Sequence, residues 1–301
     1  MLIIEKKNYK GWANSYYLTN NRVDLVVVTD VGPRVIRFGF VDGQNLFFED
    51  TKTLGVTGGD EWQLYGGHRL WHAPEAVPRT YYPDNQPVQA SIEAESLVLR
   101  QDVESTTGIK KEILIALDPR APQVEIVHRL VNHNTWPIQV APWALSVMAP
   151  GGRAIVPLPP RGSHPENLLP TSSIALWAYT HMADARWTWG NQFVFLDQDI
   201  HSPAPQKAGF YVVDGWVAYQ RGKDLLVKLF DYHPAAQYPD RNSNVELFTN
   251  HQMLEVETLG GLVTLAPGED VAHKETWLLF SDLDPIDSEA DAQRIPGLRY
   301  S

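Results

Sequence analysis

The sequence predicts an all-β fold, a large antiparallel β-sandwich formed by a single domain over residues 1–301. Short runs rich in β-branched and aromatic residues recur along the chain, and turn residues separate most of them. In addition, 22 prolines and 21 glycines are spread over the whole length, which leaves little room for long helices. Many short strands with frequent turns are typical of sandwiches and barrels.

Eight runs are expected to form strands because they combine high β-propensity with flanking turn signals such as Asp42-Gly43 and Asp118-Pro119. Helical turns are expected only at 172–180 and 288–294. The stretch 151–170, rich in proline and glycine, is expected to be irregular, and it either lines a site or forms a plain surface loop. The eight runs are residues 23–29, 34–40, 109–117, 124–131, 138–148, 209–214, 216–221 and 225–230.

The composition restricts the kinds of partner. Lysine and arginine total 25 and aspartate and glutamate total 36, which gives a formal net charge of −11. An acidic chain repels phosphate groups, so neither nucleic acid nor an anionic membrane is an expected partner. The N-terminus lacks the apolar core of a signal peptide, no run approaches the ~20 apolar residues of a membrane helix, and there is no cysteine. We therefore expect a cytoplasmic protein without disulfides or thiolate chemistry.

Residues 65–75 combine two glycines with a dense group of polar and aromatic side chains. Imidazole, guanidinium, indole and carboxylate groups close together suit a polyhydroxylated ligand such as a sugar. A zinc site is the alternative, because His68 and His72 are four residues apart. The zinc-protease pattern, however, has glutamate directly after the first histidine, where this chain has Arg69, and the glycines and Pro74 disfavour a helix. We therefore expect no metal here. The candidate ligand contacts are Arg69, Trp71, His72 and Glu75, with His68 as a candidate acid.

A second candidate segment, residues 231–257, contains His233, Asn244 and a strand with two carboxylates. Leu254 and Val256 alternate with Glu255 and Glu257, so both carboxylates should share one face, with Cα atoms roughly 6.6 Å apart. Carboxylates this close repel each other, which raises the pKa of one of them and suits general acid/base work. The alternative is a solvated outer face on which both glutamates pair with lysine or arginine.

Several motifs along the chain point to one family. The most specific is Val256-Glu257-Thr258, followed by Leu265-Ala266-Pro267-Gly268-Glu269. Weaker ones are Gly32-Pro33-Arg34-Val35-Ile36, Leu64-Tyr65-Gly66-Gly67 and Leu130-Val131-Asn132. Together these motifs resemble the galactose mutarotase-like superfamily, which includes aldose 1-epimerases and hexose-6-phosphate epimerases. The resemblance covers nearly the whole chain and implies the large β-sandwich of that superfamily. It also implies a small-molecule sugar ligand and proton transfer without a cofactor.

The resemblance implies that Glu257 is the general base that takes the proton of the anomeric hydroxyl. In aldose 1-epimerases a histidine on a central strand donates a proton to the ring oxygen, but the matching stretch here, residues 140–145, has no histidine. Residues 66–75 instead resemble an uncharacterised branch with a Gly-Gly-x-Arg-Leu-Trp-x-Ala-Pro-Glu pattern. We hypothesise that His68 replaces the missing acid.

Three functions follow from these motifs. The first is a mutarotase-like isomerase with Glu257 and His68 as catalytic residues. The second is a non-catalytic carbohydrate-binding protein, and the third is a glycoside hydrolase or lyase that uses Glu255 and Glu257 as a pair. The identity of the sugar, its phosphorylation and the oligomeric state are left open. The expected sugar contacts are Arg69, Trp71, His72, Glu75, His233, Asn244 and Glu255.

Overall fold

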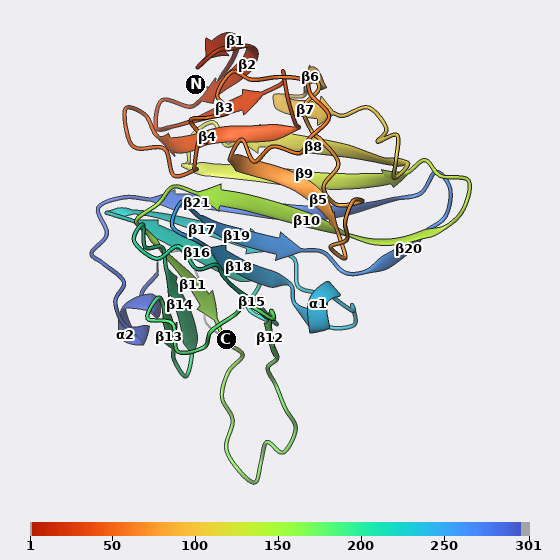
Figure 1. Ribbon diagram of the computed structural model, residues 1–301. Coiled ribbons are helices and arrows are strands. Elements are labelled where there is room, and N and C mark those ends of the chain that lie inside the picture. Colours follow the sequence, from red (N-terminus) through yellow and green to blue (C-terminus); the bar gives the residue numbers. More distant parts are fainter. Residues whose placement is uncertain (1, 296–301) are drawn as a thin grey trace.

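Two large antiparallel sheets lie face to face in the computed structural model, which describes residues 2–295 (Figure 1). The first sheet has 11 strands and the second has 10 within the described residues. In order across the first sheet these are β1 (Ile3–Tyr9), β2 (Trp12–Thr19), β3 (Val23–Val28), β4 (Arg34–Phe40), β5 (Gly67–Ala73), β10 (Ile138–Met148), β19 (Leu254–Leu259), β18 (Val245–Thr249), β15 (Gln206–Phe210) and β12 (Ile174–Leu176), while β20 (Val263–Leu265) also pairs with β10. The second sheet runs β13 (Trp187–Trp189), β14 (Phe193–Asp197), β11 (Arg153–Pro157), β16 (Trp216–Arg221), β17 (Asp224–Phe230), β21 (Asp270–Phe280), β9 (Gln123–Asn132), β8 (Ile109–Leu117), β7 (Ser96–Arg100) and β6 (Gln89–Glu93).

Alternating side chains turn one face of each sheet toward the other sheet. In β8 every second residue from Ile109 to Leu117 is buried, and in β9 the buried positions run from Val124 to Asn132. This period of two is the pattern of a strand with one covered face. The prediction of an all-β, antiparallel sandwich is confirmed.

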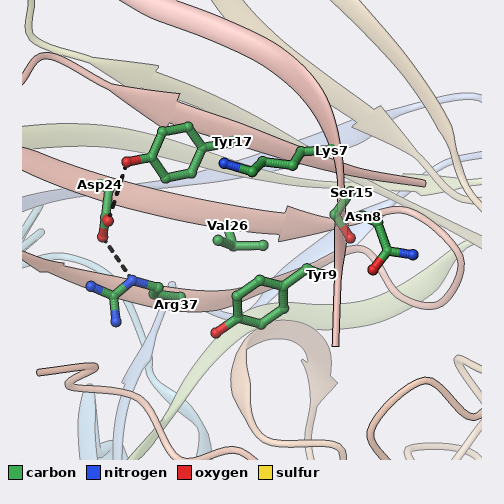
Figure 2. Close-up of a pocket in the computed structure, with 8 residues that line it drawn as sticks. All are labelled: Lys7, Asn8, Tyr9, Ser15, Tyr17, Asp24, Val26 and Arg37. Atoms are coloured by element: carbon green, nitrogen blue, oxygen red, sulfur yellow. Dashed lines mark hydrogen bonds and ion pairs between the residues drawn. The ribbon is translucent and has the colours of Figure 1, made fainter. Parts of the chain in front are cut away.

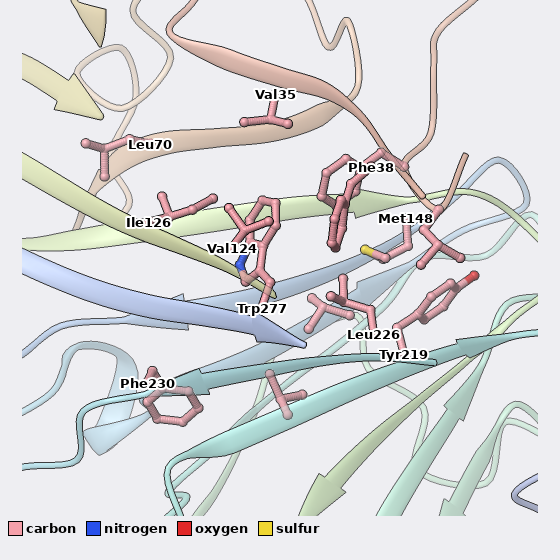
Figure 3. Close-up of a cluster of buried hydrophobic side chains, with 14 of the residues drawn as sticks. Val35, Phe38, Leu70, Val124, Ile126, Met148, Tyr219, Leu226, Phe230 and Trp277 are labelled. Atoms are coloured by element: carbon pink, nitrogen blue, oxygen red, sulfur yellow. The ribbon is translucent and has the colours of Figure 1, made fainter. Parts of the chain in front are cut away.

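The main hydrophobic core fills the space between the two sheets. Val35, Phe38 and Leu70 of the first sheet face Val124 and Trp277 of the second (Figure 3). The Trp277 indole packs against the Phe38 and Phe47 rings, with centroid distances of 5.6 and 5.4 Å. Aromatic pairs at this spacing add to the stabilisation from buried area alone.

Most predicted strands agree with the structure, and the two helix predictions have different outcomes. Residues 172–180 are not helical, because β12 and a turn occupy them. The prediction at 288–294 is confirmed in part by α2 (Glu289–Ala292), which begins with a capping box between Ser288 and Asp291. A second short element, α1 (Pro239–Asn242), contains positive φ angles at Asp240 and Arg241 and is a tight turn rather than a regular helix. No helix in residues 2–295 is long and apolar enough to cross a bilayer.

Candidate active site

The strand register places a continuous row of residues across the first sheet, on the face that points away from the second sheet. We call this face the outer face. Successive cross-strand partners share a face in an antiparallel sheet, so the row is set by pairing alone. It runs Ser15, Val28, Arg34, Arg69, Leu145, Glu257, Glu246 and Gly209. The two halves of the candidate site, on β5 and on β19, therefore lie on one surface.

A cavity of about 320 Å³ opens on the outer face over the middle of this row. We call it the central pocket. Arg69 and Trp71 of β5, Trp143 of β10 and Glu255 of β19 line it, and Lys207 of β15 closes one side. The volume fits a ligand of monosaccharide size, at the small end of ordinary ligand cavities. The remaining lining residues are Trp62, Leu64, Glu75, Tyr81, Leu145, Tyr179, Phe248, Asn250, Gln252 and Met253.

Lys207 is the cation at the centre of the carboxylate-rich side of the pocket. Its Nζ lies 2.8 Å from Glu246 Oε2 and 3.3 Å from Glu257 Oε2. The Trp143 and Trp177 rings flank the ammonium group, each with its centroid 4.8 Å from Nζ. Burial alone would lower the pKa of Lys207, but the negative charges of Glu257 and Glu246 outweigh burial and raise this pKa well above its ordinary value. Lys207 therefore stays charged at neutral pH.

Glu257 is fully buried and is held by two residues of the pocket lining, Trp143 and Lys207. Its Oε2 accepts hydrogen bonds from Trp143 Nε1 at 2.8 Å and from Lys207 Nζ at 3.3 Å. Its Oε1 is buried and has no hydrogen-bond partner. An unsatisfied buried carboxylate oxygen is costly, so Oε1 has an unused capacity to accept a hydrogen bond.

Glu255 lies two residues before Glu257 and lines the pocket directly. It accepts a hydrogen bond from Arg69 Nη2 at 3.2 Å, and the Arg69 guanidinium stacks over the Trp71 ring at 4.6 Å from its centroid. Burial raises the pKa of Glu255, the charge of Arg69 opposes this effect, and the charge of Glu257 adds to it. Burial therefore favours the protonated form of Glu255 more than that of a free glutamate.

The carboxyl groups around Lys207 and Arg69 outnumber these two cations. Glu246, Glu255 and Glu257 share Arg69 and Lys207, so the cluster is neutral when it holds one proton. Burial raises the pKa of Glu246 well above its ordinary value and also raises the pKa of Glu255. Of these two groups only Glu255 lines the cavity.

The structure brings five of the predicted site residues together. Arg69, Trp71, Glu75 and Glu255 line the central pocket, and Glu257, outside the lining, binds the lining residues Trp143 and Lys207. The carboxylates of β19 are not on a solvated face, because all six residues from Leu254 to Leu259 are buried.

The structure does not bring His68, the hypothesised acid, together with Glu257. His68 pairs with Ser146, and Ser146 pairs with Val256, so these three residues point into the sandwich, away from Glu257. His72 shares the inner face of β5 with His68, and its Nε2 lies 3.4 Å from Glu104 Oε2. Neither imidazole can reach a ligand in the central pocket.

His233 and Asn244 do not line the pocket either. Asn244 is fully buried, and its amide binds one residue twice, accepting from Val212 N at 2.7 Å and donating to Val212 O at 2.8 Å. The Asn244 side chain therefore has a structural role, which is to hold the backbone at Val212. His233 is exposed in the loop after β17, where its backbone N–H donates to Tyr238 Oη at 2.9 Å.

Sequence reasoning missed Lys207 and Glu246, and it did not assign Trp143 to the site. β15 is buried at all five positions, so Lys207 stands in a run that resembles core. A lysine inside an apolar strand was the available signal, because buried lysines are rare unless they are paired. Trp62, Tyr81 and Tyr179 lie outside the strands, and no strand pattern marks them.

His68 instead belongs to a fully buried polar cluster between the sheets, which we call the interior network. It comprises His68, Ser146, Lys228, His128, Glu275, Thr258 and His273.

The Lys228 ammonium is the centre of this network. It donates three hydrogen bonds, to Glu275 Oε1 at 2.8 Å, Ser146 Oγ at 3.0 Å and Val256 O at 3.2 Å. Glu275 also accepts from Thr258 Oγ1 at 2.5 Å and from Trp277 Nε1 at 2.7 Å. Each proton of the ammonium group thus has an acceptor.

One tautomer assignment satisfies the imidazoles. His128 Nδ1 contacts the His273 carbonyl at 3.0 Å, so Nδ1 carries the proton and Nε2 accepts from His68 Nε2 at 2.6 Å. His68 Nδ1 is then an acceptor for Ser146 Oγ–H at 2.8 Å. The ligand atoms of His68, His128 and Glu275 lie within 4.8 Å of one another, close enough to hold a metal ion. Lys228 already supplies a cation to Glu275, and the network is satisfied without an ion.

No family model matches the chain, and no curated protein matches it in sequence. Solved structures do match. A galactose mutarotase-like protein from Lactobacillus casei covers 89% of this chain and 100% of its own, at 8% identity and a TM-score of 0.55. The chain has the galactose mutarotase-like fold. A putative mutarotase from Salmonella typhimurium covers 93% of this chain and 94% of its own, at 10% identity and a TM-score of 0.58.

Two further structures extend the comparison. A putative aldose 1-epimerase from Escherichia coli K12 covers 93% of this chain and 100% of its own, at 15% identity and a TM-score of 0.52. A TPR-domain containing protein from Parabacteroides distasonis covers 95% of this chain at 13% identity and a TM-score of 0.58, and the chain spans 50% of its length. These structural matches establish the shared fold. At identities this low they do not establish a shared reaction, which has to be argued from the residues of the site.

Proposed function

We propose that the protein is a carbohydrate-active enzyme of the mutarotase type, which binds a monosaccharide in the central pocket and interconverts its anomers. The observation that carries this proposal is the position of Glu255 and Glu257, side by side on the outer face of β19 under an aromatic-lined cavity. The C–H faces of a sugar ring would stack on Trp71 or Trp143, and its hydroxyls would bind the Arg69 and Glu75 side chains.

In the proposed reaction Glu257 takes the proton of the anomeric hydroxyl, and Glu255 gives its proton to the ring oxygen. The bond between C1 and the ring oxygen breaks, the C1–C2 bond rotates, and the reverse proton transfers close the ring on the other face of C1. Lys207 and Trp143 hold the Glu257 carboxylate in place. No cofactor enters, because only protons move.

The side-by-side arrangement favours anomer exchange over hydrolysis. The anomeric oxygen and the ring oxygen are bonded to the same carbon, so two carboxyl groups in one wall can serve both. In glycoside hydrolases the two carboxyl groups flank the scissile bond from opposite sides. Glu255 and Glu257 leave the same strand on the same face and cannot flank a substrate.

The experiment is polarimetry of freshly dissolved monosaccharides, with NMR anomer exchange as a second readout. Glu255→Gln and Glu257→Gln should each lower the rate in excess of buffer by about 10² to 10⁴, the usual contribution of a positioned acid or base. The matched control is Glu125→Gln, a half-exposed glutamate that pairs with Lys274 on the other sheet and should leave the rate unchanged. Folding of each variant is checked by circular dichroism.

Three outcomes overturn the proposed reaction. Equal rates for the parent and both glutamine variants remove these carboxyl groups from catalysis. Saturable sugar binding by calorimetry without any anomer exchange makes the protein a non-catalytic binder. Release of reducing ends from oligosaccharides identifies a hydrolase instead.

A further inference from the structure

A second cavity, of about 260 Å³, opens on the outer face near the edge of the first sheet. We call it the edge pocket. Its floor is a cross-strand row in which Tyr17 of β2 pairs with Val26 of β3, and Val26 pairs with Arg37 of β4. The edge pocket shares no lining residue with the central pocket.

Two tyrosines form the walls of the edge pocket. Figure 2 shows the Tyr17 and Tyr9 rings around a hollow above Val26. Tyr9 reaches the pocket because the β1–β2 register shifts between Lys7 and Tyr9, and such a bulge redirects the side chains that follow it. The Lys7 ammonium lies 5.0 Å from the centroid of the Tyr17 ring.

Polar groups mark two parts of the pocket. Arg37 Nε donates to Asp24 Oδ1 at 2.8 Å, which joins a planar donor and a carboxylate acceptor, and Tyr17 Oη lies 3.4 Å from Asp24 Oδ2 (Figure 2). Elsewhere in the lining Ser15 is only 1% exposed, and its Oγ has no hydrogen-bond partner. A buried hydroxyl without a partner costs free energy unless a ligand or a water satisfies it.

We infer that the edge pocket is a second, non-catalytic carbohydrate-binding site. The aromatic walls and the apolar floor accept the C–H faces of one sugar ring. The Asp24–Arg37 pair accepts from one ring hydroxyl and donates to its neighbour, and Ser15 binds a third. The inference stands on this pocket alone and does not depend on the proposed reaction.

The same contacts argue against an apolar ligand and against catalysis. The polar groups of the lining are poorly suited to a purely apolar molecule, and the lining carries two cations, Lys7 and Arg37, against the one carboxylate of Asp24, so an anion is the ligand that the phosphate titration below tests. Asp24 is the sole carboxylate in the lining, and Arg37 already pairs with it. Burial raises the pKa of both tyrosines, so their hydroxyls stay protonated at neutral pH and donate rather than act as bases.

Methyl glycosides separate this inference from the proposed function, because they cannot open their rings and so cannot mutarotate. Protein labelled with ¹³C at tyrosine ring positions is titrated with methyl β-D-glucopyranoside, methyl β-D-galactopyranoside and methyl α-D-mannopyranoside to about 50 mM, above a millimolar Kd. Spectra of Tyr9→Phe and Tyr17→Phe identify the two reporter signals. Tyr81 and Tyr179 report on the central pocket in the same spectra.

At least one glycoside should shift the Tyr9 and Tyr17 signals with a saturable dependence on concentration. Ser15→Ala and Tyr17→Ala should each weaken this binding by about fivefold or more. Glu257→Gln, which belongs to the central pocket, should leave it unchanged. The inference is overturned if no glycoside moves these two signals. It is also overturned if only sodium phosphate or sodium benzoate moves them, or if Ser15→Ala and Tyr17→Ala bind as the parent does.

Discussion

Replacing Lys228 by methionine tests the interior network, because this ammonium group is the single cation that the described contacts place on Glu275. Methionine keeps an unbranched side chain of similar volume but removes three hydrogen bonds, to Glu275, Ser146 and Val256. Glu275 would keep its bonds from Thr258 and Trp277, yet its charge would be buried without a partner.

The expected magnitude follows from the burial of both partners, 1% and 0% exposed at their side chains. Removing one partner of a buried ion pair costs about 3–5 kcal/mol, because the other charge stays in a medium of low polarity. Replacing both partners, as in Lys228→Met with Glu275→Leu, should cost less than Lys228→Met alone, since no charge is then left unpaired.

The assay is urea unfolding followed by tryptophan fluorescence, with the free energy of unfolding extrapolated to zero denaturant. The control is Lys274→Met, on the strand position next to Glu275 but exposed and paired with Glu125, which should cost about 1 kcal/mol or less. If Lys228→Met costs no more than Lys274→Met, or if the double variant is less stable than the single one, the reasoning about the network is refuted.

Two further predictions concern the pH dependence of stability and the hydrogen bonds of the Asn244 amide. Burial lowers the pKa of His68, His128 and His273, the last to about 3, so at these three groups the unfolded chain binds more protons than the folded chain once the pH falls below about 6.5. The free energy of unfolding should therefore decrease from pH 7.5 to about pH 5, and an unchanged or higher value by urea titration would contradict this sign. Asn244→Ala should cost about 1–3 kcal/mol, since both bonds to the Val212 backbone are lost. Sugar affinity measured by calorimetry on the folded variant should stay at the parent value, and a large loss of affinity would return Asn244 to the binding site.

The sandwich could be predicted from the sequence because a strand with one covered face alternates apolar and polar residues with a period of two. In β8 and β9 buried and less buried residues alternate, so their bounds and faces follow from the pattern. The shared face of Glu255 and Glu257 was predicted from the same alternation, and the pairing with β18 and β10 confirms that they lie on one face.

Where both faces of a strand are covered, the pattern is lost. All seven residues of β5 are buried, so nothing in the order His68, Arg69, Leu70, Trp71 distinguishes the core from the pocket. Polarity was the only remaining guide, and it failed at His68 because the interior is itself polar at that point. β12 was missed because three residues are too few to show a period.

The hydrogen bond between His68 and Ser146 has a consequence for how β5 docks on β10. A shift of one residue would turn every β5 side chain to the opposite side and put the Arg69 guanidinium among the hydrophobic residues of the core. It would also separate the imidazole from its serine partner and leave Lys228 and Glu275 with an incomplete set of contacts. The buried hydrogen bond between His68 and Ser146 thus favours one register of β5 on β10. That register decides which side chains of β5 stand on the outer face.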